Sequence, residues 1–171
     1  VNGKVTHDGS SGSVTITFGG AGRLKLGGEF LTSATATLTP GEGTIEYDGS
    51  RVQTVGSFSY NNLVLSGLLV KTMTAGTTIA GHLSIAPTGT ALAKLVVGQD
   101  ITAGTLILGG LVRASGTWGA SDSAADHKDD NYFAASTGRL VVTSGSSLTT
   151  TVSIWPTATA IVYGQALLAS T

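Results

Sequence analysis

The densest group of side chains that could do chemistry lies in SDSAADHKDDNYF, residues 121–133. Several carboxylates in one short loop could supply the oxygen ligands that a calcium ion prefers. Their spacing matches neither an EF-hand loop nor a calcium-binding nonapeptide repeat, and Lys128 lies among them. We therefore interpret the segment as a solvated insertion loop, with a weak calcium site as the alternative. The candidate ligands of that site are Asp122, Asp126, Asp129 and Asp130.

The other reactive residue types form no catalytic or metal-binding pattern. The histidines, His7, His82 and His127, are far apart and lack zinc-ligand spacing. Serine is abundant, but there is no G-x-S-x-G motif and no convincing Ser-His-Asp arrangement. We expect no catalytic residue, no cofactor and no tightly bound metal.

Three carboxylates in GEGTIEYDG, those of Glu42, Glu46 and Asp48, could suggest the paired acids of an enzyme that acts on polysaccharides. Glu46 and Asp48 are two positions apart in a strand-like run, which would direct both outward. Beside Arg51 they are better explained as surface ion pairs. The sequence therefore predicts a protein that is not an enzyme.

The composition favours strands over helices. Only 11% of the residues are charged, too few to solvate the outer faces of amphipathic helices. The 25 glycines suit tight turns, and abundant Thr, Val and Ile suit the surface of a sheet. With 171 residues, 41% of them hydrophobic, the chain can build one sizeable core.

Charge and hydropathy also limit the partners and the location. A net charge of -1 provides no basic patch for nucleic acid, and no apolar run approaches the length of a membrane span. The chain lacks cysteine, and its Ser, Thr and Gly bias is more typical of an exported polymer, so we expect a secreted or cell-surface protein. Because it begins VNGKVTHDGS, without Met or a signal-peptide pattern, we expect a segment of a longer precursor.

A short motif, two apolar residues at positions i and i+2, recurs along the chain. The pairs are Leu24/Leu26, Leu63/Leu65, Leu83/Ile85, Leu106/Leu108 and Leu140/Val142. The steps between their first members run from 24 to 63, 63 to 83, 83 to 106 and 106 to 140. These steps indicate a period near 20, with one coil less clearly marked and one lengthened by an insertion.

This period predicts an all-β fold, a right-handed parallel β-helix (solenoid) with coils of about 20 residues, because each coil repeats the same inward-facing positions. The alternative is a β-sandwich, in which successive strands need not resemble one another. In the solenoid the apolar pairs would be buried and stacked in register. Trp118 is expected to anchor the end of the core. The Thr-x-Thr runs, such as Thr15/Thr17 and Thr37/Thr39, are not expected to share the register of a flat ice-binding face.

Residues 43–92 carry the motifs GTIEYDG, QTV, YNNLVLSG and KTM in that order. They resemble repeats of large bacterial surface and secreted proteins of the autotransporter-associated β-strand and filamentous-haemagglutinin-like kind. Residues 104–142, with GTWG and a polar loop, resemble the closing unit of such arrays, and residues 154–171 resemble the first strand of an immunoglobulin-like module. The resemblance implies a parallel β-helix with a structural or adhesive role and supplies no catalytic residues.

The C-terminal part of the chain contains two further strand-like runs after the closing motif. We therefore divide the chain into a β-solenoid domain, 1–147, and a C-terminal strand segment, 148–171. A lone apolar strand is unstable in water, so this segment is predicted to be exchanged with a neighbouring subunit, against its strands around residues 5–18. The predicted interface residues are Val152, Ile154, Trp155, Ala160, Val162 and Tyr163.

Together these features predict a non-enzymatic extracellular structural protein. It would be a homopolymer subunit of a fibre, sheath or surface layer, assembled by β-strand contacts between subunits. The alternative is an adhesin segment that binds glycans or cell surfaces.

Overall fold

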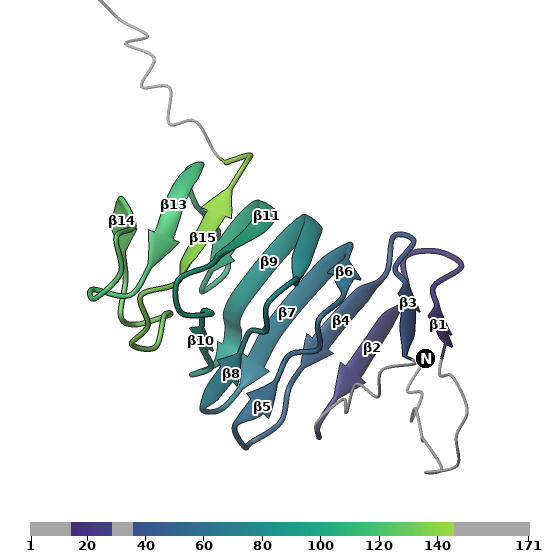
Figure 1. Cartoon of the computed structure of the whole chain (residues 1–171). Coiled ribbons are helices and arrows are strands. Elements are labelled where there is room, and N and C mark those ends of the chain that lie inside the picture. Colours follow the sequence, from purple (N-terminus) through teal and green to yellow (C-terminus); the bar gives the residue numbers. More distant parts are fainter. Residues whose placement is uncertain (1–14, 29–35, 146–171) are drawn as a thin grey trace, which may run out of the picture.

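The computed structural model describes residues 15–28 and 36–145. These residues form a parallel β-solenoid of about 4 turns and contain no helix (Figure 1). Strands of successive coils pair in parallel in the order β2 (Arg23–Leu26), β4 (Thr44–Tyr47), β7 (Asn62–Gly67), β9 (Thr78–Gly89) and β11 (Asp100–Leu108). Pairing joins position 23 to 44, 44 to 62, 63 to 83 and 83 to 106, so the period stays near 20. The predicted solenoid is confirmed, and the β-sandwich alternative is wrong.

Each coil also contributes to shorter sheets beside this main one. One sheet consists of β5 (Gln53–Thr54), β8 (Val70–Thr72) and β10 (Leu92–Lys94), all parallel. Another pairs β1 (Thr15–Thr17) with β3 (Thr37–Thr39). Within the main sheet, β6 (Ser59–Tyr60) also pairs with β9. The sheets surround one apolar core, as expected for coils that turn back onto the coil before.

The core contains two apolar ladders along the main sheet. Register places the first residue of each apolar pair on the next in the order Leu24, Ile45, Leu63, Leu83, Leu106. The second ladder runs Leu26, Tyr47, Leu65, Ile85, Leu108. All six members in β7, β9 and β11 are fully buried, so their predicted stacking is confirmed. Full burial of such a side chain stabilises the fold by about 1.5–3 kcal/mol.

Two details of the repeat differ from the prediction. The coil between Leu24 and Leu63, which the pattern of apolar pairs marks only weakly, supplies Ile45 and Tyr47 to the ladders. The pattern does not single out this coil because an aromatic residue, Tyr47, takes the second ladder position. The pair in β15 (Arg139–Val142) does not continue these ladders. Leu140 instead stacks on Ile101, at the start of β11. The intervening residues 109–138 form the C-terminal end of the solenoid before the chain returns to pair β15 with β11.

Glycine recurs after the apolar pairs because successive coils approach closely at one corner. A Cβ on Gly67 would lie 2.5 Å from the carbonyl oxygen of Asp48, and a Cβ on Gly89 would clash with the carbonyl oxygen of Gly67. Both glycines also have positive φ, 73° and 82°. At the other end of the strands Asn62 links coils instead: its Oδ1 accepts the His82 N–H at 3.2 Å.

The motifs QTV and KTM place two polar side chains inside the coil. Lys71 is fully buried, and its Nζ donates to the carbonyl oxygens of Gly49 at 2.7 Å and Arg51 at 3.1 Å. Gln53 donates to Leu26 O at 2.8 Å and accepts from Gly49 N at 2.9 Å. Burial lowers the pKa of the Lys71 ammonium, although the charge of Asp48 opposes this shift. These side chains add hydrogen bonds to the corner backbone, where Leu26 O and Gly49 O also accept from the backbone N–H groups of Asp48 and Leu68.

Antiparallel strands close the C-terminal end of the coil. The strand β12 (Leu111–Val112) folds back on β11, and β13 (Gly116–Gly119) pairs antiparallel with β15 and parallel with β14 (His127–Lys128). Trp118 belongs to the core and stacks against His127 with ring centroids 4.5 Å apart, and its Nε1 donates to Ala114 O at 3.0 Å. Its predicted role as an anchor at the coil end is confirmed.

The threonines of β1 and β3 correct one expectation. Thr15 lies opposite Thr37, and Thr17 lies opposite Thr39, so these two Thr-x-Thr runs do share a register. All four side chains are exposed. A period near 20 does not predict this match, because the step from 15 to 37 is slightly longer than that period.

Candidate functional site

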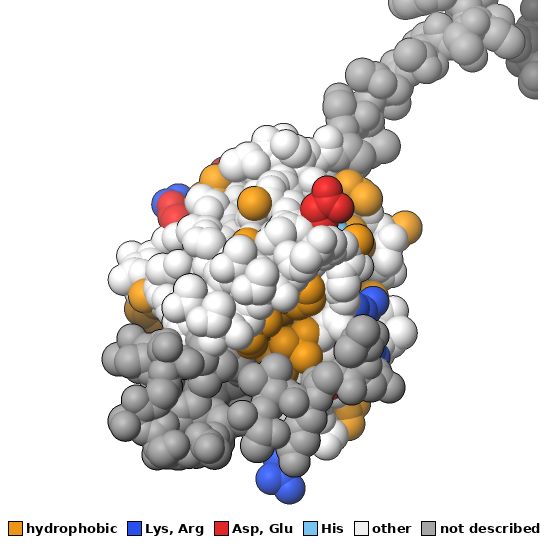
Figure 2. Space-filling view, turned by 90° about the vertical axis from the view of Figure 1, so that its right-hand side faces the viewer, with side chains coloured by type: hydrophobic (Ala, Val, Ile, Leu, Met, Phe, Trp, Pro, Cys, Tyr) orange, Lys and Arg blue, Asp and Glu red, His pale blue; other side chains and the backbone are white. Residues whose placement is uncertain are grey.

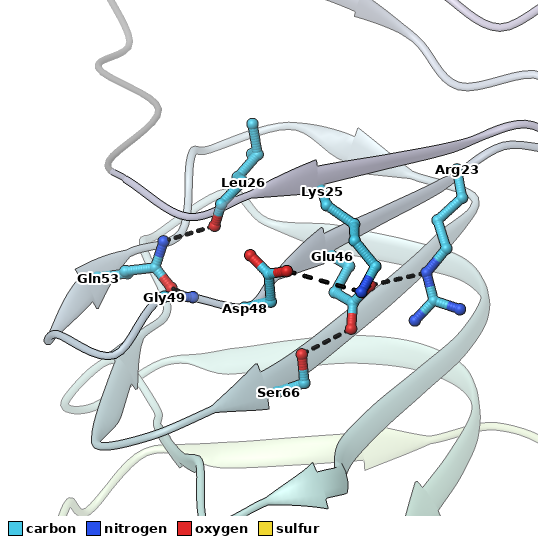
Figure 3. A network of polar contacts seen from close by, with 8 residues as sticks. All are labelled: Arg23, Lys25, Leu26, Glu46, Asp48, Gly49, Gln53 and Ser66. Carbon is cyan, nitrogen blue, oxygen red and sulfur yellow. Dashed lines mark hydrogen bonds and ion pairs between the residues drawn. The ribbon is translucent and has the colours of Figure 1, made fainter. Parts of the chain in front are cut away.

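The largest group of interacting charges in the described residues surrounds Glu46 on the face of the main sheet opposite the ladders (Figure 3). Its Oε2 lies 2.8 Å from Arg23 Nε and 3.2 Å from Lys25 Nζ. Its Oε1 accepts a hydrogen bond of 2.6 Å from Ser66 Oγ. Lys25 also lies 3.6 Å from Asp48, so the network joins strands of three successive coils.

Parallel pairing brings this network together. Lys25 lies directly opposite Glu46, and Arg23 lies two residues earlier on the same strand. The prediction that Glu46 and Asp48 face outward and form ion pairs is confirmed. The expected partner is wrong, because the cations are Arg23 and Lys25 of the preceding coil and not Arg51, and Glu46 is only 3% exposed.

The electrostatics keep the Glu46 carboxylate ionised. Burial alone would raise its pKa, but hydrogen bonds from Ser66, Arg23 and Lys25 outweigh burial and lower it. Both carboxylate oxygens already have partners. Glu46 is thus arranged to link coils, and it is poorly placed to exchange a proton with a substrate.

A second polar group lies in the core. Tyr60 OH donates to Gly56 O at 2.7 Å, and Tyr47 OH accepts from Gly56 N at 3.0 Å. Because Tyr60 uses its hydrogen for Gly56, Tyr47 is the donor in the 3.2 Å bond between the two hydroxyls. Burial raises the pKa of both phenols, so this pair is neutral and has a packing role.

The structure does not bring the calcium candidates together. Asp122 accepts from Ser136 N, Asp126 from Thr117 Oγ1, Asp129 from Asn131 N and Asp130 from Ser121 N, at 2.7–3.1 Å. In the described ranges no three His, Cys, Asp or Glu side chains form a group that could hold a metal ion. Each aspartate instead fixes part of the loop at the coil end, and the arrangement gives the calcium hypothesis no support.

The exposed large apolar side chains in residues 15–28 and 36–145 are all aliphatic. They are Val52, Leu68, Leu69, Val97, Leu111 and Val112. An aromatic strip of the kind that stacks on sugars is not among them. The same ranges contain no helix that is long and apolar enough to span a membrane.

The predicted subunit interface cannot be placed on this surface. Its six residues, Val152, Ile154, Trp155, Ala160, Val162 and Tyr163, lie outside the described residues, as does the whole segment 148–171.

Comparison with known proteins adds no identity: no family model, no curated protein and no solved structure matches this chain. The class of protein that the geometry defines is the β-solenoid.

Sequence reasoning missed the polar residues that join the coils. Ser66 lies in the motif YNNLVLSG, but neither it nor Arg23 nor Lys25 was predicted to join coils. The signal that could have found them is the coil offset, because aligning RLKL (23–26) with TIEY (44–47) places Lys25 on Glu46. The same kind of alignment places Gln53 on Lys71 in the next coil.

Proposed function

We propose that this chain is a non-enzymatic structural module of the bacterial cell exterior, related in kind to the β-strand repeats of large surface and secreted proteins. It forms part of a fibre, sheath or surface layer, and copies join one another through β-strand contacts.

One observation carries this proposal: the repeated side chains are used in contacts between coils. Apolar pairs fill the ladders, glycines permit the corners, and Gln53, Lys71 and Glu46 bind neighbouring coils. Such a design supports a stiff scaffold, whereas a catalytic site needs convergent groups free to meet a substrate.

The segment 148–171 supplies the subunit contact in this proposal. Its predicted interface side chains would add to a sheet edge of the next subunit. Donation from one copy to the next is heterologous and does not close on itself, so it would produce a filament.

The proposal is tested on the full chain by sedimentation velocity and negative-stain electron microscopy over a range of concentrations. We expect regular filaments to appear as the concentration rises. A matched pair of variants adds the same charge at a predicted interface residue, Val162→Asp, and at a neighbouring residue outside the predicted interface set, Thr159→Asp; only the first should abolish filaments. A chain that stays monomeric at every concentration would contradict the proposal.

A further inference from the structure

The N-terminal end of the described coil has an edge that receives no described strand. β2 pairs with β4 on one side, and no strand in residues 15–28 or 36–145 pairs with its other side. Leu26, at the end of a ladder, is partly exposed, whereas its counterparts in β7, β9 and β11 are fully buried. Figure 2 faces this end, where apolar side chains are visible.

The corner glycine of this coil also points to a missing neighbour. Gly28 occupies the register position of Gly49, because Leu26 lies opposite Tyr47. A Cβ on Gly49 would lie 2.5 Å from the Gly27 carbonyl oxygen of the coil before, so glycine is required there. A Cβ on Gly28 would meet nothing within 4 Å. The corner is therefore shaped for a preceding coil that the described residues do not supply.

The sequence contains a segment with the pattern of such a coil. GKVTHDG, residues 3–9, aligns without gaps with GRLKLGG, residues 22–28, and with GTIEYDG, residues 43–49. The steps from 3 to 22 and from 22 to 43 fall between two steps observed for paired coils, 44 to 62 and 83 to 106. Val5 takes the ladder position of Leu24.

We propose that residues 3–9, which lie outside the described residues, dock on the outer edge of β2 as one more parallel strand. Val5 covers Leu24, His7 covers Leu26, and Gly9 meets Gly28 at the corner. Thr6 faces outward beside Lys25. The added strand provides hydrogen-bond partners for an edge that would otherwise be open to other chains. This inference does not depend on the proposed function.

A pair of charge variants tests it in the full chain. Val5→Asp places a carboxylate in the ladder, whereas Thr6→Asp places the same carboxylate one residue away on the outer face. We expect Val5→Asp to lower the melting temperature by about 5 °C or more, since each kcal/mol shifts it by about 2–4 °C in a domain of this size. Thr6→Asp should leave it nearly unchanged. Equal shifts for the two variants would overturn the proposal.

A disulfide test identifies the occupant directly, because the chain has no cysteine of its own. The double variant Thr6→Cys with Lys25→Cys should form an intramolecular disulfide on mild oxidation, since residues opposite each other in adjacent strands lie within disulfide reach. Thr6→Cys with Thr102→Cys, several coils further along, should not. A disulfide that links two chains would overturn the proposal and assign the edge to a second copy, and failure to form any disulfide would also contradict it.

Discussion

At the scale of single residues, Glu46 shows how the coils are joined by charge. The carboxylate receives one hydroxyl and two cationic donors from neighbouring strands, and it is nearly inaccessible to water. Exposed ion pairs contribute little to stability, but a buried carboxylate with every oxygen satisfied is costly to disrupt.

Glu46→Gln should therefore make stability less dependent on pH. The folded-state pKa of Glu46 is lower than its ordinary value of 4.5, so its contribution is present above about pH 4.5 and is lost as pH falls through the folded value. At pH 7 we expect the variant to lose about 1–3 kcal/mol of unfolding free energy, and the difference from the parent should shrink below about pH 4. Denaturant titrations at several pH values measure this. Glu42→Gln, at an exposed carboxylate, is the control, and a constant difference across the pH range would contradict the prediction.

Leu83→Asp tests the ladders themselves. Leu83 is fully buried between Leu63 and Leu106, so the variant places an uncompensated charge in a dry core. We expect a loss of several kcal/mol or failure to fold. Thr78→Asp, at an exposed position of the same strand, should be nearly neutral. Circular dichroism melting curves compare the two, and a Leu83→Asp protein that melts like the parent would exclude this register.

At the scale of elements, the corners separate two reasons for glycine. Gly89 and Gly98 both have positive φ, 82° and 69°, but a Cβ would clash with Gly67 only at Gly89. Gly98→Ala should cost about 1 kcal/mol through backbone strain alone. Gly89→Ala should cost clearly more, because two coils would also have to separate. Chemical denaturation of both variants provides the comparison, and similar losses would show that close approach does not matter.

The elements also show what the sequence could predict. Period and alternation were enough for the solenoid and for six buried ladder residues, because the same position in each coil meets the same neighbours. They could not show that Leu140 stacks on Ile101, since a recurring apolar pair does not reveal which wall of the coil it occupies. Inward-facing Lys71 contradicts simple polarity rules, because its carbonyl partners come from the coil before. The subunit-interface residues predicted in segment 148–171 lie outside the described residues and stay predictions from sequence.

At the scale of the whole molecule, the two ends of the coil differ. The C-terminal end is covered by β12 and β13, so another coil cannot simply continue the sheets there. Subunits joined end to end would need a different connection, and in the proposed function this is the C-terminal strand segment.

Deleting residues 153–171 should therefore leave a folded protein that no longer polymerises. The described coil keeps its ladders and its closing strands in this variant, so its melting temperature should change by only a few degrees. Light scattering coupled to size-exclusion chromatography should report a monomer. Normal filaments from the truncated chain would exclude the segment as the connection.

The closing strands also have a consequence for the order in which the chain is made. The strands β12 and β13 come after β1 to β11 in the chain. During synthesis the outer edge of β11 is therefore unpaired until residues 111–142, which contain its partners β12 and β15, have emerged. Open sheet edges on incomplete chains are sites of aggregation. A ribosome that stalls shortly after Leu108 would release a chain with a nearly complete coil and an unprotected edge, and such fragments should be the first to need a chaperone or a protease.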